Sequence, residues 1–277
     1  MSSDQQKLEF LDALRRHEAE SVLSRLKPGL RLLELGGGAG WQARLLSEHG
    51  AQVTAIDVAE SHYLEQAVFL VTIYDGHHIP GADGEFEVIF SSNVLEHIPH
   101  IDEMLLETKR VLRAEGVAWH ILPTASWRFW STWTHLLSVW GQAGHCVREG
   151  ASSASARPGD GLLRRGMRGV ARGSLHLMGN LWPRRHGELG NLCTEFWLFS
   201  RFRWRKKFRE QGWIVMEDHP LELFYTGSSL LGSWLPIPWR RRLSTILGSA
   251  CRLYVLSPAK ARTRELPTRE AHSSELA

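Results

Sequence analysis

The chain has 277 residues, of which 43% are hydrophobic and 23% are charged, and its formal net charge is +3. These values are typical of a globular protein and exclude both a collagen-like chain and one that is disordered throughout. The length suits one domain, or one domain with a large insertion. No signal peptide or membrane-spanning apolar stretch is recognised. Three widely spaced cysteines give no disulfide framework, so a cytoplasmic protein is expected.

The small net charge conceals an uneven distribution. Residues 1–123 carry a net charge of −9, residues 124–277 carry +12, and the second part holds 10 of the 12 tryptophans. The two parts are therefore expected to have different roles. Clustered positive charge indicates an anionic partner, which is a nucleic acid, a phospholipid or a phosphorylated substrate.

Strand and helix patterns alternate over the first part of the chain. Residues 4–26 have hydrophobic side chains at helical spacing, and Pro28-Gly29 ends that predicted helix. Strands are then predicted at residues 31–35, 52–56, 71–74, 87–91 and 117–122, with helices between them at 41–49, 61–70 and 101–112. This order is typical of an α/β fold in which crossover helices cover both faces of a parallel sheet.

After Pro123 the pattern changes to long helices rich in tryptophan and arginine. Residues 126–140 place Trp127, Trp130, Trp133, Leu137 and Trp140 on one helical face. A loop is predicted at 148–161, and a cationic helix at 162–178 carries Arg164, Arg165, Arg168 and Arg172. The remaining elements are a helix capped by Thr194 that runs to Gln211, and strands at 213–216 and 253–256.

These segments divide the chain into five parts. They are an N-terminal helix (1–28), an α/β core with the candidate cofactor site (29–123), an insertion rich in Trp and Arg (124–194), a C-terminal helix with the last strands (195–258) and a flexible tail (259–277).

The segment ELGGGAG, residues 34–40, follows the first predicted strand. Glycine permits a sharp turn and lets a ligand approach the backbone, and the helix that follows points N–H groups at an anion. Gly36, Gly38 and Gly40 form GxGxG, whereas a dinucleotide fingerprint needs its third glycine at the position of Trp41. This spacing disfavours a nicotinamide oxidoreductase. A tight turn that binds nothing is the alternative.

Polar side chains also follow the next three strands. Asp57 ends the second strand, where an acid can accept hydrogen bonds from ribose hydroxyls, and Asp75-Gly76 follows the third. Ser92 and Asn93 follow the fourth. Each acid alone can be a solvated loop residue. Together they lie at the carboxyl ends of strands, where open α/β sheets bind ligands.

Taken in order, ELGGGAG, AIDVA, YDG, FEVIFSSNVLEHI and ETKRVLRAEGVAWHILP resemble class I S-adenosylmethionine-dependent methyltransferases of the type 11-like group, over residues 30–123. The resemblance implies a Rossmann-like sheet of seven strands with the last antiparallel, a helical insertion after strand 5, and S-adenosyl-L-methionine as cofactor. Asp57 would hold the ribose and Asp75 the adenine. The positions that it assigns to the cofactor are Glu34, Gly36, Gly38, Gly40, Asp57, Asp75, Gly76, Ser92 and Asn93.

The second half is similar to methyltransferases of bacterial surface-polysaccharide gene clusters, in WRFWSTWTHLL and TEFWLFSRFRWRKKF. This likeness implies O-methylation of a saccharide or of a lipid-linked envelope intermediate, as in lipopolysaccharide biosynthesis. RNA, a quinone or another lipid as acceptor, and a non-catalytic scaffold, are the alternatives. RNA is disfavoured because no RNA-binding module is recognisable, and no DNA partner is predicted. The sequence does not predict the oligomeric state.

Two histidines are candidate catalytic residues. A sugar hydroxyl is a poor nucleophile at neutral pH, so a general base would help. His97 follows the fourth strand and is the first candidate, since the pKa of imidazole lies near neutrality. His186 is the second. The plain alternatives are that His97 orders its loop and that His186 is a surface residue. No metal site is predicted, because the 14 histidines are scattered.

The tryptophan stripe at 126–140 has three interpretations: packing in the core, a lid that stacks on sugar rings, and seating on a membrane surface. The arginines of 162–178 and the basic run at 201–207 favour an anionic partner, including peripheral contact with an anionic membrane. A solvated helix face also explains such runs.

Overall fold

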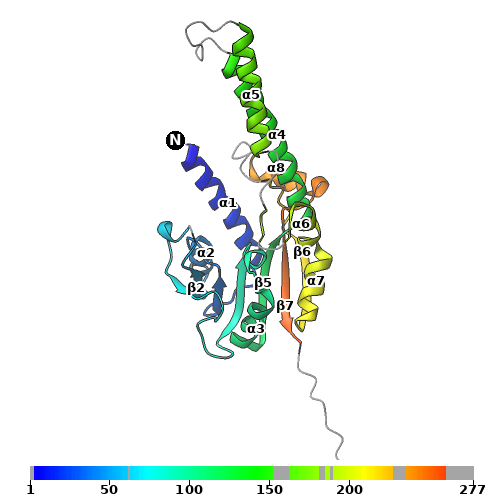
Figure 1. The fold of residues 1–277 in the computed structure, drawn as a ribbon. Coiled ribbons are helices and arrows are strands. Elements are labelled where there is room, and N and C mark those ends of the chain that lie inside the picture. Colours follow the sequence, from blue (N-terminus) through cyan, green and yellow to red (C-terminus); the bar gives the residue numbers. More distant parts are fainter. Residues whose placement is uncertain are drawn as a thin grey trace, which may run out of the picture.

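The computed structural model describes residues 3–61, 63–151, 162–180, 185–187, 190–226 and 235–259. Its centre is a seven-stranded sheet in the order β3-β2-β1-β4-β5-β7-β6 (Figure 1). The strands are β1 (Arg31–Leu35), β2 (Gln52–Val58), β3 (Val71–Tyr74), β4 (Phe86–Ser92), β5 (Leu112–Pro123), β6 (Trp213–Pro220) and β7 (Cys251–Pro258).

The strand directions match the predicted fold. The first five strands pair in parallel, and β7 runs antiparallel to both of its neighbours, β5 and β6. The predicted α/β, Rossmann-like sheet of seven strands with an antiparallel last strand is therefore confirmed. Between β1 and β4 the chain order reverses, because β1 leads outward to β2 and β4 leads outward to β5. Such a reversal is where open α/β sheets form their ligand crevice.

Helices cover both faces of the sheet. They are α1 (Ser3–Leu23), α2 (Trp41–Glu48), α3 (Ile101–Val111), α4 (Ala125–Ala151), α5 (Leu162–Asn180), α6 (Leu192–Leu198), α7 (Arg201–Glu210) and α8 (Ile237–Leu247). The central strands β1 and β4 are buried along almost their whole length, because helices cover both of their faces. Leu33 of β1 packs in a core with α3 and α7, and Leu32 packs in a core with α1 and α2.

The helical insertion after strand 5 is present as a projecting hairpin. In Figure 1, α4 and α5 extend together away from the sheet. They pack antiparallel, since His135 bonds to the carbonyl of Asn180 near the base, and Gly173 lies against Ala143 further out. The predicted loop begins later than expected because α4 continues to Ala151, and the rest of that loop lies outside the described residues. The same holds for the tail beyond Ala259.

Two helix predictions are wrong. The described residues of the range 61–70 contain only a single helical turn, η1 (Leu64–Gln66). The chain then crosses over the glycine loop, where the Val68 N–H donates to the carbonyl of Ala39 at 2.8 Å. The helix predicted to run from Thr194 to Gln211 is two helices, α6 and α7. Ser200 separates them, and its side chain accepts a hydrogen bond from Arg203 N–H as an N-cap.

Candidate functional site

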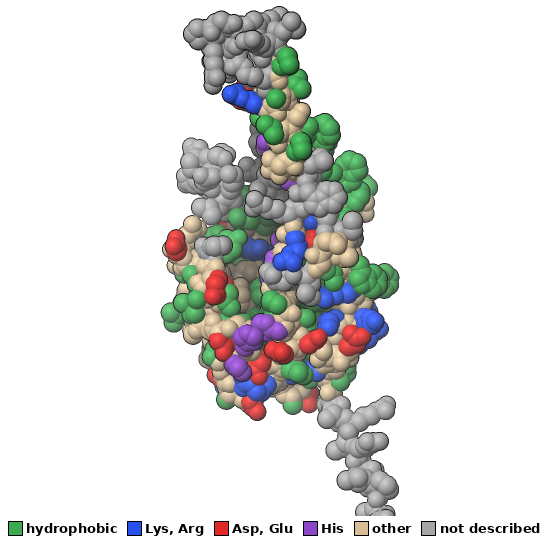
Figure 2. Space-filling model, viewed as in Figure 1, with side chains coloured by type: hydrophobic (Ala, Val, Ile, Leu, Met, Phe, Trp, Pro, Cys, Tyr) green, Lys and Arg blue, Asp and Glu red, His purple; other side chains and the backbone are tan. Residues whose placement is uncertain are grey.

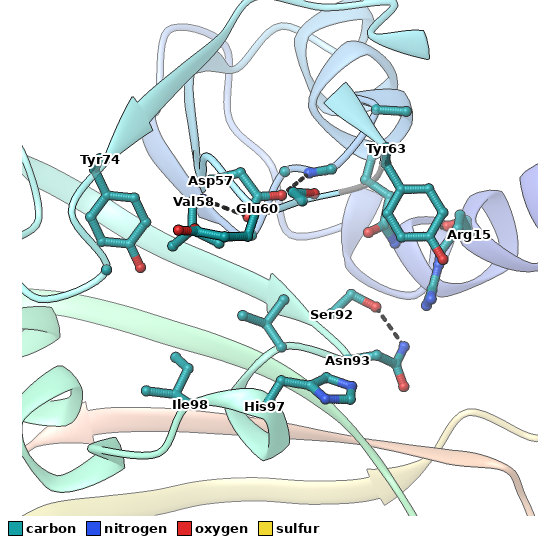
Figure 3. A pocket seen from close by; sticks show the side chains of 18 of the residues that line it. Arg15, Asp57, Val58, Glu60, Tyr63, Tyr74, Ser92, Asn93, His97 and Ile98 are labelled. Atoms are coloured by element: carbon teal, nitrogen blue, oxygen red, sulfur yellow. Dashed lines mark hydrogen bonds between the residues drawn. The ribbon is translucent and has the colours of Figure 1, made fainter. Parts of the chain in front are cut away.

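A cavity of about 600 Å³ opens at the carboxyl ends of β1, β2 and β4 (Figure 3). Its walls come from the loops after these strands, from the loop after β3 and from α1. The volume lies within the range of small-molecule and cofactor sites. Of the residues predicted to bind the cofactor, six line this cavity: Gly36, Gly38, Asp57, Gly76, Ser92 and Asn93.

The glycine loop forms the floor of the cavity at the end of β1. Gly36 and Gly38 have φ angles of 75° and 54°, in the left-handed region that favours glycine. A Cβ atom at Gly36 would lie 2.3 Å from a methyl carbon of Val94, so no side chain fits there. The N–H groups of Gly36 and Gly37 both donate to the carbonyl of Ile56 in β2. These bonds hold bare backbone against the cavity.

Asp57 joins β2 to the glycine loop. One carboxylate oxygen, Oδ2, accepts the N–H of Gly38 at 2.7 Å, and the other, Oδ1, accepts the N–H of Val58 at 2.8 Å. A carboxylate offers about four lone-pair positions, and Asp57 borders the cavity. Its remaining lone pairs can therefore accept hydrogen bonds from a pair of hydroxyl groups.

Three of the residues predicted to bind the cofactor do not line the cavity. Asp75 is exposed, and its carboxylate turns back to accept the N–H groups of His77 and His78 and to pair with the His78 ring at 2.9 Å. The predicted contact between Asp75 and adenine is thus not supported. Gly40 packs against Phe69 at the start of α2.

Glu34 is buried beneath the glycine loop rather than facing the cavity. It is 2% exposed, and its Oε2 atom has no hydrogen-bond partner among the described residues. Burial raises the pKa of Glu34 to about 8, although the N–H of Ala43 lowers it in part. Glu34 is therefore a buried acid that supports the loop.

Helix α1 adds a cation that sequence reasoning missed. Arg15 lines the cavity (Figure 3). It donates a hydrogen bond to Glu18 at 2.7 Å. Glu18, 6% exposed, also accepts the hydroxyl of Ser92 at 2.8 Å and the side-chain N–H of Asn93 at 3.2 Å. The sequence shows Arg15 and Glu18 one helical turn apart, but their place at this end of the cavity depends on how α1 packs.

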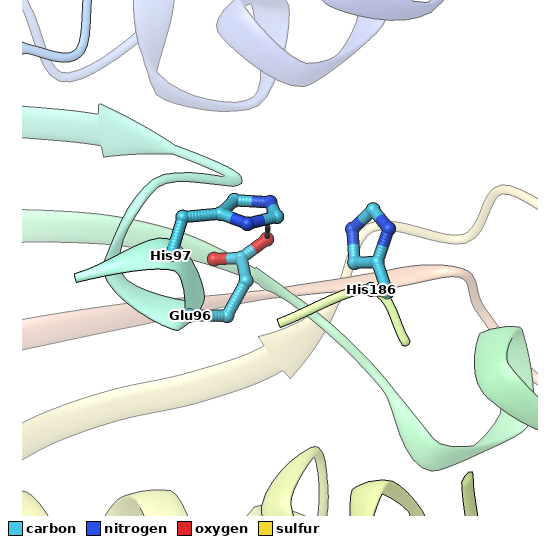
Figure 4. Close-up of side chains that lie close together, drawn as sticks. All are labelled: Glu96, His97 and His186. Carbon is cyan, nitrogen blue, oxygen red and sulfur yellow. Dashed lines mark ion pairs between the residues drawn. The ribbon is translucent and has the colours of Figure 1, made fainter. Parts of the chain in front are cut away.

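The two candidate catalytic histidines, 89 positions apart in the sequence, lie together (Figure 4). The rings of His97 and His186 meet edge to face, with their centroids 4.9 Å apart. His97 lines the cavity. Burial, followed by the nearby charges of His97 and Arg128, lowers the pKa of His186 to about 4. Glu96 lies beside them with its side chain 1% exposed, and burial raises its pKa to about 8.

A buried ion pair fixes the segment that carries His186. Glu195 of α6 accepts the N–H groups of His186 and Gly187 through Oε1, at 2.7 Å and 3.1 Å. Its other oxygen pairs with Arg128 of α4 at 2.7 Å, and both side chains are at most 5% exposed. Trp127 packs on the His186 ring, with centroids 4.5 Å apart. The base of the hairpin thus holds His186 against His97.

The profile of the methyltransferase domain family matches residues 8–156, which is more than half of the chain. The chain belongs to this family. The match includes most of α1, the glycine loop, Asp57 and the Glu96-His97 turn. S-adenosylmethionine is the cofactor that this membership implies, and the cavity has suitable features for it: bare backbone at Gly36 and Gly38, and a carboxylate at Asp57.

Curated relatives of this methyltransferase domain act on different acceptors. It is 32% identical to a malonyl-[acyl-carrier protein] O-methyltransferase of Serratia marcescens, over 38% of this chain and 44% of that protein. It is 35% identical to a sarcosine/dimethylglycine N-methyltransferase of Halorhodospira halochloris, over 38% of this chain and 42% of that protein. A ubiquinone biosynthesis O-methyltransferase of Xanthomonas axonopodis pv. citri is 32% identical, over 38% of this chain and 48% of that protein. The chain therefore spans less than half the length of these relatives.

Solved structures share the fold of the methyltransferase domain at low sequence identity. A chain from the complex between the Haloferax volcanii Trm112 methyltransferase activator and a methyltransferase is 13% identical and has a TM-score of 0.53, covering 93% of this chain and 95% of that one. The [4+2]-cyclase SpnF is 14% identical with a TM-score of 0.50, covering 90% and 82%. These likenesses show the fold alone, and function has to be argued from the site.

Proposed function

We propose that the protein is an S-adenosylmethionine-dependent methyltransferase. The observation that carries this proposal is the cavity at the reversal between β1 and β4, which has a floor of bare glycine backbone and the Asp57 carboxylate at its side. Methyl transfer from a sulfonium needs the acceptor atom in line with the methyl carbon and opposite sulfur. Positioning of this kind supplies much of the rate in such displacements.

The residues around the cavity suit the three parts of the cofactor. Asp57 would accept hydrogen bonds from the ribose hydroxyls, and the backbone at Gly76 would lie along the adenine. Arg15 would pair with the carboxylate of the methionine part, beside Ser92 and Asn93. Arg15 is suited to this because a guanidinium binds a carboxylate through two parallel hydrogen bonds.

For the acceptor we propose a hydroxyl of a cell-envelope saccharide, free or carried on a lipid. The resemblance of the second half to methyltransferases of surface-polysaccharide clusters supports this class. His97 borders the cavity, and the ring of His186 packs against the ring of His97. An acceptor that enters here would therefore meet an imidazole group able to take up or orient its proton. The aromatic hairpin at the same end offers surfaces for sugar rings or lipid.

We further propose that the hairpin makes peripheral contact with an anionic membrane. Among the described residues, no helix is both long enough and apolar enough to cross a bilayer. However, Figure 2 shows hydrophobic side chains along the projecting hairpin. Trp133, Leu137 and Trp140 lie on one face of α4 and are 50–60% exposed. Interfacial aromatic residues on helices that also carry cationic charge suit a lipid headgroup layer.

A quinone or other lipid acceptor is the second candidate, favoured by the likeness to a ubiquinone biosynthesis O-methyltransferase. Incubation with methyl-labelled S-adenosylmethionine and separate envelope-saccharide, lipid-quinone and RNA fractions distinguishes the acceptors. Label in the saccharide fraction alone supports the proposed acceptor. Label in the lipid-quinone or RNA fraction refutes the saccharide acceptor but still supports methyltransferase activity. A scaffold without activity would label none of them.

Calorimetry with S-adenosylhomocysteine tests the cofactor site. The wild-type protein should bind it saturably, and Asp57→Asn and Arg15→Gln should each weaken binding at least about tenfold, since a charge-assisted hydrogen bond contributes about 1.5–3 kcal/mol. The matched controls are two exposed residues. Asp83→Asn lies just before β4, at the end of the strands opposite to the cavity, and Arg16→Gln changes a side chain that is 56% exposed. Both should bind like wild type.

A truncated ligand separates the two ends of the site. 5′-Methylthioadenosine lacks the amino-acid part, so Asp57→Asn should weaken its binding while Arg15→Gln leaves it unchanged. Absence of saturable S-adenosylhomocysteine binding by folded wild-type protein would refute the proposed function. Equal loss of both ligands in Arg15→Gln would refute the role of Arg15.

A further inference from the structure

We propose that Glu96, His97 and His186 form a binding site for a divalent transition-metal ion of the zinc type, at the acceptor side of the cavity. Each residue offers one ligand atom, and these atoms all lie within 4.8 Å of one another (Figure 4). Two imidazoles and one carboxylate, with a further position left open, are one of the ligand sets of catalytic zinc sites. The site itself does not depend on the proposed function, but its role in methyl transfer does.

The Glu96 carboxylate is the strongest single indication. Neither of its oxygens accepts a hydrogen bond of good geometry from the described residues, although the side chain is 1% exposed. Its Oε1 atom lies 3.8 Å from His97 Nε2. Burial of a carboxylate without hydrogen bonds is costly, and a bound cation offsets that cost.

The surroundings keep the ligands in place. Glu195 holds the backbone of His186 and Gly187, and Arg128 holds Glu195 in turn. Gly187 lies directly on the turn that carries Glu96: a Cβ atom there would be 3.0 Å from the Glu96 carbonyl oxygen. Such second-sphere support is typical of metal sites.

Metal binding requires the three ligand atoms to move closer together. Ligand atoms on a tetrahedral zinc with bonds of about 2.1 Å lie about 3.4 Å apart, so the atoms here have to approach by roughly 1 Å. Small side-chain rotations of His97, which is 40% exposed, can supply most of this movement. Because Glu96 and His186 are held by their surroundings, His97 is expected to close the site.

The ion would change the role of His97. His97 lines the methyl-transfer cavity, so an ion held by His97 would lie at the wall of that cavity, within reach of the acceptor. An acceptor hydroxyl bound there has a lowered pKa and releases its proton to solvent. Its oxygen then bonds to the methyl carbon, and the carbon–sulfur bond breaks with its electron pair left on sulfur, which yields neutral S-adenosylhomocysteine. In this arrangement His97 holds the ion and does not itself take the proton.

Titration of the metal-stripped, full-length protein with Zn²⁺ by calorimetry, and with Co²⁺ by visible absorption, tests the site. Wild type should bind one ion per chain, and Co²⁺ should give the intense visible bands of a low-coordinate site. Glu96→Gln and His186→Ala should each weaken binding at least about tenfold. Glu195→Gln, which weakens the support of His186 and the ion pair with Arg128 but removes no ligand, should weaken Zn²⁺ binding by about 10-fold to 100-fold.

The matched control removes another group of histidines at the edge of the cavity. The His77 ring stacks on His100 at 4.0 Å, and His78 pairs with Asp75. The double variant His77→Ala/His78→Ala should retain full Zn²⁺ affinity. Loss of binding in this control, with binding kept in Glu96→Gln and His186→Ala, would assign the ion to an adventitious surface site and overturn the proposal.

Parallel titration with S-adenosylhomocysteine keeps the two proposals distinct. Cofactor binding without any Zn²⁺ or Co²⁺ binding overturns the metal site alone. Metal binding without cofactor binding overturns the proposed function alone. Thermal melting by circular dichroism identifies any variant that fails to fold, and His97→Ala, at a partly exposed position, then replaces Glu96→Gln as the test.

Discussion

At the scale of single residues, Gly36 shows how the sequence dictates the cavity floor. Its backbone is left-handed, and the space that a side chain would need is occupied by Val94. Gly29 has nearly the same φ, 77° against 75°, but nothing lies within 4 Å of its would-be Cβ atom. The two positions therefore share the backbone strain of a non-glycine residue and differ only in the steric overlap.

We expect Gly29→Ala to lower the free energy of unfolding by about 1–2 kcal/mol, the cost of a left-handed residue with a Cβ atom. Gly36→Ala should lower it by at least twice as much, because Val94 also has to move. The double variant Gly36→Ala/Val94→Ala should recover part of the difference. Urea denaturation measures all three. Equal losses in the two single variants would show that the overlap with Val94 is relieved without cost.

Prediction of site residues from the sequence depends on how local their geometry is. Asp57 and the glycine loop belong to adjoining strand ends, and a motif encodes their relation. Asp75 also follows a strand end. Its carboxylate, however, accepts hydrogen bonds from two N–H groups of its own turn, so it does not reach the cavity. The position of Arg15 in the cavity wall depends on how distant elements pack, and so does the contact between His97 and His186. No local pattern reveals contacts of that kind.

At the scale of elements, the buried strands were predictable because both sides of the central sheet exclude water. Helix α8 was missed because three successive arginines, 240–242, resemble an exposed segment. In the structure Arg240 is fully buried: it donates to the carbonyls of Leu235 and Phe224 and lies over the ring of Phe10. Only the tertiary structure supplies those carbonyls.

The α4–α5 hairpin gives a prediction at this scale. Wild-type protein should float with vesicles that contain phosphatidylglycerol at low salt, and Trp133→Ser/Trp140→Ser should float several-fold less. Both side chains are at least half exposed, so stability should change by no more than about 0.5 kcal/mol for each.

The control for the hairpin is Trp197→Ser, because Trp197 is 59% exposed but lies on α6. It should float like wild type. Wild-type protein that stays at the bottom of the gradient, or an equal loss in the control, would contradict membrane contact through the hairpin.

At the scale of the whole molecule, ion pairs connect elements of the second part of the chain to the first part and to one another. Asp102 of α3 binds Lys207 of α7 at 2.9 Å, and Arg25 binds Glu217 of β6 at 2.7 Å. Arg201 and Arg205 both bind Asp218, which is 1% exposed. Part of the basic run at 201–207 therefore fastens α7 to the sheet. These basic side chains already pair within the protein, so we expect an anionic partner to bind at the hairpin rather than at residues 201–207.

Buried titratable groups make the stability of the molecule depend on pH in two directions. Burial lowers the pKa of His120 to about 3 from 6.5, so the unfolded chain binds more protons between these values and stability falls as the pH falls through them. Glu34 acts oppositely. Its pKa is about 8 in the folded protein and 4.5 in the unfolded chain, so the folded protein binds more protons in that window and stability falls as the pH rises.

Glu34→Gln removes the second effect, because a glutamine does not ionise. Its free energy of unfolding, relative to wild type, should rise steadily from pH 5 to pH 8, with a slope of at most about 1.4 kcal/mol per pH unit for one proton. Urea denaturation at pH 5, 6.5 and 8 measures the slope. Glu48→Gln, on the 55% exposed side chain that pairs with Arg44, is the control and should parallel wild type. A constant difference between wild type and Glu34→Gln would mean that Glu34 ionises in the folded protein as it does in the unfolded chain, and that water reaches the base of the glycine loop.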